Sequence, residues 1–129
     1  MSERLLWTGQ VLFGLYFVAI GVVHFVVPEG LPAQMAWMYD LSDTLHAVAG
    51  TAEILGGLGL ILPAVTRILP WLVPLAAAGL AVVMVAAAVW HVGRGELPQV
   101  VLTLVNAGIL ALIAYGRLWV SPLEARDGR

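Results

Sequence analysis

The sequence predicts an all-α membrane protein built as an antiparallel bundle of four transmembrane helices. Of its 129 residues, 61% are apolar and only 11% are charged. The mean hydropathy of +0.97 lies far above the range of ordinary soluble domains. The apolar residues also gather in four long runs, each near the roughly 20 residues that a helix needs to cross about 30 Å of hydrocarbon.

The four spans have recognisable ends and short connections. Pro28 is expected to close the first span, Ser42 to cap the second and Pro63 to stop it. The connections of about 17, 7 and 4 residues are too short to fold alone, which predicts a single integral membrane domain over residues 1–129. The predicted spans cover about residues 5–27, 45–62, 70–92 and 97–119.

Composition excludes several classes of function. A formal net charge of -2 with only six basic residues leaves no basic stripe for a nucleic acid, so we expect no nucleic-acid partner. The absence of cysteine removes disulfides, thiolate metal sites and thiol nucleophiles. The partner that the composition does predict is the lipid bilayer.

Arginine placement predicts the orientation. Four crossings put both termini on one side, and that side collects every arginine except Arg94, which predicts cytoplasmic termini in the plasma membrane. The long first connection then faces outward and mixes acidic residues with Trp37 and Tyr39. We interpret it as an anchor at the membrane surface rather than a lid over a cavity. The arginines on the terminal side are Arg4, Arg67, Arg117, Arg126 and Arg129.

Few polar side chains interrupt the apolar runs, and such residues usually point into a bundle. Read at three- and four-residue steps, they fall on one face of each helix, together with glycines that allow close helix packing. This pattern predicts one shared polar interior. The residues are Gln10, His24, His46, Glu53, His91, Gln99, Thr103 and Asn106.

Depth along the helices places these groups in the outer half of the membrane, except for Gln10, which is expected near the cytoplasmic end. At about 1.5 Å per residue, Glu53 and Asn106 lie about 12–14 Å below the outer ends and His24 about 6 Å below. We therefore predict a pocket that opens outward, with Glu53 and Asn106 at its floor and imidazoles nearer its rim. His46 and His91 are expected near the mouth.

Glu53 admits two interpretations. A carboxyl at mid-span either handles protons or binds a ligand, or it is a satisfied polar lock that fixes helix register; we favour the first. Three histidines and one carboxylate resemble a set of metal ligands, but no two histidines stand four residues apart on one helix, so we predict no metal site. No segment shows a catalytic motif, and the catalytic residues stay undefined.

Several segments resemble one family. GVVHFVVPEGLPAQMAWMYD, AEILGGLGLILP with Glu53, AAAVWHVGRGE with His91, and AYGR at the end of the last span are similar to the DoxX-like family of small bacterial and archaeal membrane proteins. The resemblance covers nearly the whole chain. It implies a four-helix membrane bundle associated with membrane oxidoreductase or oxidative-stress systems, and it points to Glu53 and His91, with Arg94, Glu96 and Asn106, for testing.

These observations lead to one main hypothesis and its alternative. The main hypothesis is a redox-associated subunit, at most an accessory subunit of a membrane oxidoreductase, that binds quinone or another small apolar ligand in the outward-facing pocket. The alternative is a non-catalytic scaffold or assembly factor that packs against another membrane protein or itself. Quinone is the candidate cofactor, and the expected ligand-binding residues are Glu53, His91, His24, Asn106 and Thr103.

Overall fold

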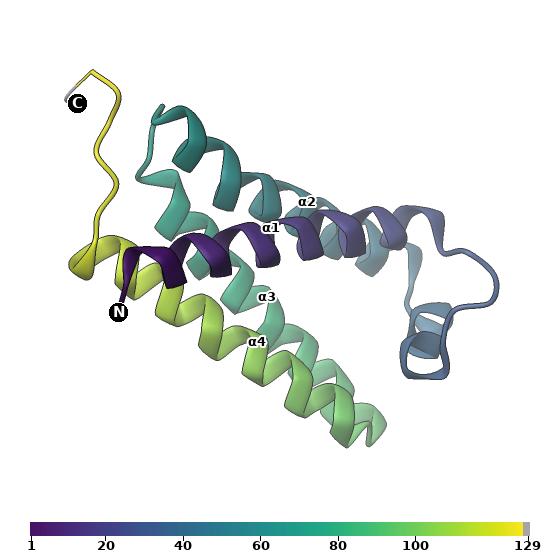
Figure 1. Cartoon of the computed structure of the whole chain (residues 1–129). Helices are drawn as coiled ribbons and strands as arrows, with labels where there is room; N and C mark the ends of the chain where they lie inside the picture. Colours follow the sequence, from purple (N-terminus) through teal and green to yellow (C-terminus); the bar gives the residue numbers. More distant parts are fainter. Residues whose placement is uncertain (128–129) are drawn as a thin grey trace.

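The computed structural model describes residues 1–127, and every element of secondary structure in that range is a helix (Figure 1). Four helices are long and apolar enough to cross a membrane, so the chain is a multi-pass membrane protein. In chain order the elements are α1 (Glu3–Val26), η1 (Ala33–Asp40), α2 (Asp43–Thr66), α3 (Leu72–Arg94), α4 (Leu97–Tyr115) and η2 (Gly116–Val120).

Local chemistry sets most of the helix ends. The Ser2 hydroxyl accepts a hydrogen bond from the Leu5 amide, and the Ser42 hydroxyl does the same for Leu45, which caps α1 and α2. At their carboxyl ends, α2 and α3 stop where Arg67 and Gly95 adopt positive φ angles of 60° and 71°. The four predicted spans are thereby confirmed as helices, with shifted boundaries.

Three features of the helices differ from the sequence-based expectation. Pro63 lies inside α2 and does not stop it. Both Pro63 and Ala64 are fully or almost fully buried, so packing outweighs the one backbone hydrogen bond that proline cannot donate. The last span changes at Gly116 from an α-helix to the single π-helical turn η2, and the first connection folds into the 3₁₀ helix η1.

Glycines set the register between α1 and α2. A Cβ atom on Gly57 would lie 2.6 Å from the Gly14 carbonyl oxygen, and one on Gly50 would lie 2.9 Å from the Gly21 carbonyl oxygen. The two helices run antiparallel with their backbones in contact at both crossings, as small residues permit in membrane helices. The same register brings the side chains of His24 and His46 together near one end of the pair.

The four helices form two pairs that lie closest at the end with both chain termini and spread apart toward η1 (Figure 1). α1 packs on α2, α3 packs on α4, and α2 joins the pairs by packing on α3. The core lies where the pairs meet, and its centre is fully or almost fully buried. Its largest members are Phe17, Leu60, Leu80, Met84 and Leu110.

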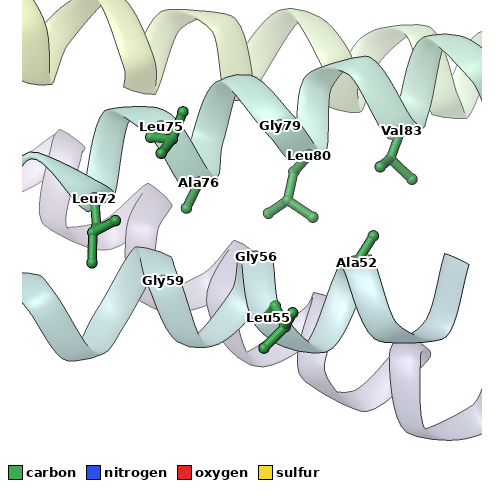
Figure 2. A pocket seen from close by; sticks show the side chains of 10 residues that line it. All are labelled: Ala52, Leu55, Gly56, Gly59, Leu72, Leu75, Ala76, Gly79, Leu80 and Val83. Carbon is green, nitrogen blue, oxygen red and sulfur yellow. The ribbon is translucent and has the colours of Figure 1, made fainter. Parts of the chain in front are cut away.

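An apolar groove of about 340 Å³ runs between α2 and α3. Figure 2 shows Leu80 pointing from α3 toward Gly56 of α2, where an added Cβ would lie 2.5 Å from Leu80 Cγ. The small residues Gly59 and Ala76 face each other nearer the terminal end. The groove is therefore a product of small residues along the seam, and neither Glu53 nor any histidine lines it.

Candidate functional site

A chain of three buried titratable side chains lies between α1 and α2. The Nδ1 atoms of His24 and His46 are 2.8 Å apart, and His46 Nε2 lies 2.8 Å from the carbonyl oxygen of Met38. His24 Nε2 lies 3.4 Å from Glu53 Oε2, an ion-pair distance. All three side chains are more than nine-tenths buried. The structure thus joins two predicted site residues, His24 and Glu53, to His46.

The Met38 carbonyl fixes the direction of this chain. A carbonyl only accepts, so His46 Nε2 donates to it. The 2.8 Å contact between the two Nδ1 atoms requires one further proton, whereas the 3.4 Å contact between His24 and Glu53 does not require a third. A third proton would make the group neutral as a whole, either as two neutral rings with a carboxylic acid or as an imidazolium with a carboxylate. Neutrality suits a site in hydrocarbon, where a net charge is costly.

Glu53 keeps unused hydrogen-bonding capacity. Its Oε2 atom is buried and has no hydrogen-bond partner of good geometry among residues 1–127, although His24 stands at ion-pair distance. An unsatisfied carboxylate oxygen in a buried site normally costs free energy. Glu53 is therefore the one member of the chain that is poised to accept from, or donate to, a further group.

The remaining predicted residues take different positions. Asn106 of α4 is buried. Thr103 contributes less, because its hydroxyl donates to the Gln99 and Val100 carbonyls of its own helix.

His91 belongs to a second cluster at the end of α3. Its Nδ1 lies 3.0 Å from Glu96 Oε1, and Arg94 Nε donates to that same oxygen at 2.7 Å. The Arg94 guanidinium also donates to Asp40 at 2.7 Å and lies 4.7 Å from the centre of the Trp90 ring. His91 and His24 are not in contact. Trp37 stands between them, with ring centres 5.0 Å from His91 and 6.0 Å from His24.

The pKa of Glu96 is lowered, first by its hydrogen bond to Arg94 and then by its hydrogen bond to His91. Glu96 lies in the turn between α3 and α4, outside the spans. It is therefore a carboxylate at neutral pH that holds His91 and Arg94 in place. This gives His91 a structural partner, whereas His24 faces the less satisfied Glu53.

The segment η1 covers this end of the bundle. Met38 is fully buried, and its backbone carbonyl accepts from His46 of α2. Asp40 pairs with Arg94 of α3, and the Gln34 carbonyl accepts from Gln99 of α4. With Trp37 against His24 of α1, this one short helix contacts all four spans. It acts as a cover packed on protein, which goes beyond the surface anchor expected from its composition.

A family model described as the DoxX-like family matches residues 8–115. The chain belongs to the DoxX-like family. No curated protein and no solved structure matches it. The matched range includes all five predicted ligand-binding residues together with His46, Arg94 and Glu96, and it ends just before η2. The expected resemblance and the predicted fold of this DoxX-like protein are both confirmed.

The DoxX-like chain carries a third polar network, at the end with the termini, that sequence reasoning missed. Arg117 of η2 is only 3% exposed; its Nε donates to Gln10 Oε1, and its Nη1 donates to the Glu3 carboxylate at 2.9 Å. Gln10 in turn donates to the Leu60 carbonyl of α2, and Ser121 donates to Glu3. The sequence did contain one indication of this network, because Gln10 is a polar residue within the first apolar run and no partner was predicted for it.

His46 was assigned to the membrane interface from its depth, yet it is the direct partner of His24. The glycine spacing held the missing information, because pairing Gly14 with Gly57 and Gly21 with Gly50 also aligns these histidines. Within the described part of the chain, no group of three or more His, Asp or Glu side chains is arranged to hold a metal ion.

Proposed function

We propose that this DoxX-like protein is a redox-associated membrane subunit that binds quinone, or another small apolar ligand bearing a carbonyl, beside Glu53. The observation that supports this most directly is the buried Glu53 Oε2, which stands 3.4 Å from His24 Nε2 and lacks a well-formed hydrogen bond among the described residues. A carbonyl oxygen needs a donor, and a protonated Glu53 or His24 supplies one.

The chain of three titratable side chains suits a ligand whose proton content changes. Reduction of a quinone consumes two electrons and two protons; in this proposal Glu53 donates a proton to the ligand and takes up another from water, and His24 stabilises the carboxylate in between. The chain has no cysteine pair, so in this proposal the electrons come from a partner oxidoreductase. The proposed role is to hold the ligand and supply its protons.

Asn106 and Tyr16 are proposed to complete the site. Tyr16 is 41% exposed on α1, and Asn106 is a buried residue of α4. The two helix pairs diverge toward η1 (Figure 1). We propose that an apolar ligand enters between α1 and α4 from the bilayer, with Asn106 as a second hydrogen-bond partner.

The test is ligand-dependent thermal stabilisation of the purified chain in lipid nanodiscs, with a short-tailed benzoquinone as the probe. A ligand at about 100 times its Kd stabilises its protein by about 2.7 kcal/mol. We expect the benzoquinone to raise the thermal midpoint of the wild type by the amount that this stabilisation gives, and to leave the midpoint of Glu53→Leu unchanged. Glu29→Leu, the same chemical change in the exposed first connection, is the matched control and keeps the shift.

A second variant separates binding from proton exchange. Glu53→Gln retains a donor but cannot release a proton, so we expect it to bind the benzoquinone with an affinity that no longer changes with pH. Equal stabilisation of the wild type and Glu53→Leu would contradict the site. Identical pH dependence in the wild type and Glu53→Gln would contradict the proton role.

A further inference from the structure

A cavity of about 260 Å³ lies at the end of the molecule with the chain termini, remote from Glu53. Its wall is formed by the beginning of α3, by η2 and by the segment that follows η2. That last segment is held in place where the Arg126 amide donates to the Arg67 carbonyl at 2.9 Å. The apolar wall residues include Pro70, Trp71, Pro74, Leu118 and Leu123, and the one charged wall residue is Arg117.

Arg117 brings unused donor capacity to this wall. Its Nε and Nη1 atoms are occupied by Gln10, Glu3 and the Ser121 carbonyl. Its Nη2 atom is buried and has no hydrogen-bond partner within residues 1–127. A buried guanidinium nitrogen with unpaired N–H groups costs free energy, and an acceptor in the cavity would remove that cost.

The surrounding charge favours an anionic acceptor. Four of the five arginines in the described residues lie at this end, the exception being Arg94, and Arg129 lies outside the described range. The Glu3 carboxylate is paired with Nη1 of Arg117, and the remaining charges at this end are Arg4, Arg67 and Arg126 against Glu124 and Asp127, which leaves an excess of positive charge. A planar guanidinium that offers further N–H groups is well matched to phosphate oxygens.

The apolar wall adds a requirement on the rest of the ligand. Trp71 is 59% exposed at the rim, and tryptophan in this position is typical of the level of lipid headgroups. Proline and leucine side chains offer contact to a glycerol backbone and the first carbons of an acyl chain, and no hydrogen bonds to a sugar or a base. The site therefore combines one cation with apolar surroundings, which fits an anionic amphiphile.

We propose that this cavity binds the phosphate group of an anionic phospholipid, with Nη2 of Arg117 as donor and Trp71 beside the glycerol region. The π-helical turn η2 is the local cause of the site, because it follows directly on α4 and carries both Arg117 and Leu118 into the cavity wall. Lipid binding in this cavity does not require a ligand at Glu53.

The experiment measures which lipid stays bound. The chain is incorporated in nanodiscs of phosphatidylcholine with one-fifth phosphatidylglycerol, extracted in mild detergent and analysed by native mass spectrometry. We expect the wild type to retain the two lipids at a phosphatidylglycerol-to-phosphatidylcholine ratio at least tenfold above the ratio in the disc. Leu123→Trp fills the cavity without touching the hydrogen bonds of Arg117, and it should abolish this enrichment. Trp119→Ala, an exposed change in the same turn η2, is the control.

Arg117→Gln tests the cation itself and should also abolish the enrichment, whereas Arg94→Gln at the opposite end should not. If Arg117→Gln fails to fold, Leu123→Trp still decides the result. Stabilisation by inorganic phosphate in pure phosphatidylcholine discs, without enrichment of phosphatidylglycerol, would assign the cavity to a soluble phosphate and overturn the lipid. Enrichment that survives Leu123→Trp would overturn the cavity.

Discussion

Single side chains in this protein carry unusually specific roles, because few polar groups occupy the hydrocarbon region. His46 is the clearest example: one nitrogen donates to the Met38 carbonyl, and the other meets His24. A ring with both nitrogens engaged has a fixed orientation. His46 is therefore a positioning residue, and it delivers a defined face of His24 to Glu53.

Removing His24 should be much more costly than neutralising Glu53. His24→Ala leaves Glu53 buried opposite an empty space and deprives His46 of its partner, and breaking a buried pair in this way typically costs about 3–5 kcal/mol. Glu53→Gln keeps the shape and offers an amide N–H to His24, so its cost should stay below about 1.5 kcal/mol. Unfolding in mixed detergent and sodium dodecyl sulfate measures both. Equal costs would mean that the two side chains do not interact.

The Glu96 carboxylate should make stability depend on acid pH. Because Arg94 and His91 lower its pKa in the folded chain, its contribution is fully present above the unfolded pKa of about 4.3 and is lost as pH falls through the folded pKa. Glu96→Gln should therefore lower the thermal midpoint at pH 7 and converge with the wild type at acid pH. Glu29→Gln serves as the control, with no such convergence. A constant difference across pH would contradict the ion pair.

At the scale of helices, the backbone contact between α1 and α2 sets the position of the candidate site. The two contacts Gly14–Gly57 and Gly21–Gly50 leave no room for a methyl group. A shift of one residue along either helix would separate His24 from His46. The glycines are therefore part of the site's architecture although they carry no chemistry.

Gly57→Ala should destabilise the protein by about 1–3 kcal/mol, because its methyl group would lie 2.6 Å from the Gly14 carbonyl oxygen and force the helices apart. Gly79→Ala, where nothing lies within 4 Å, should be neutral or stabilising by up to about 1 kcal/mol. Both variants gain the same helix propensity from Gly to Ala, so the difference between their unfolding free energies in one assay reports the steric effect at Gly57. A stable Gly57→Ala protein would show that α1 and α2 are not in backbone contact.

The cover η1 should loosen when its ion pair is removed. Arg94→Gln breaks the contacts with Asp40 and Glu96. The Met38 carbonyl still accepts from His46 of α2, and the Tyr39 hydroxyl still donates to the Pro28 carbonyl. We expect faster amide exchange in residues 33–40, with α2 unchanged, as measured by hydrogen–deuterium exchange and mass spectrometry. Arg67→Gln at the opposite end is the control. Unchanged exchange in η1 would show that the ion pair does not hold the cover.

At the scale of the whole molecule, a polar network closes each end of an apolar bundle. Arg117 joins α1 to η2 at one end, and the cluster of Asp40, Arg94 and Glu96 joins η1 to the turn after α3 at the other. Between these ends the helices are held by apolar packing and glycine contacts. Each network lies where water or headgroups can solvate its outer groups.

The two ends should face opposite sides of the membrane, with both termini in the cytoplasm. Because the chain has no cysteine, a single introduced cysteine gives an unambiguous label. In intact cells, a membrane-impermeant maleimide should react with Ala36→Cys of η1, and with Glu124→Cys only after permeabilisation. The opposite pattern would reverse the orientation that the arginines predict.

The sequence alone determines the number of crossings, the helical period of the polar faces and the small residues that allow close packing. These are local properties: hydropathy and a 3.6-residue period are read within one segment. On this basis Glu53, His24 and Asn106 could be predicted to face inward. Pro63 is an exception to these local rules. They assign it to a helix end, whereas it lies inside α2 because burial outweighs its backbone preference.

Only the tertiary structure decided which polar groups meet. The pairing of His46 with His24, the contact of η1 with all four spans and the burial of Arg117 against Glu3 join residues between 8 and 114 positions apart in the chain. Such contacts depend on the register and divergence of whole helices, which backbone approach at glycines sets and which no local pattern contains. The sequence therefore placed Glu53 in the membrane interior, and the tertiary structure placed His24 beside it.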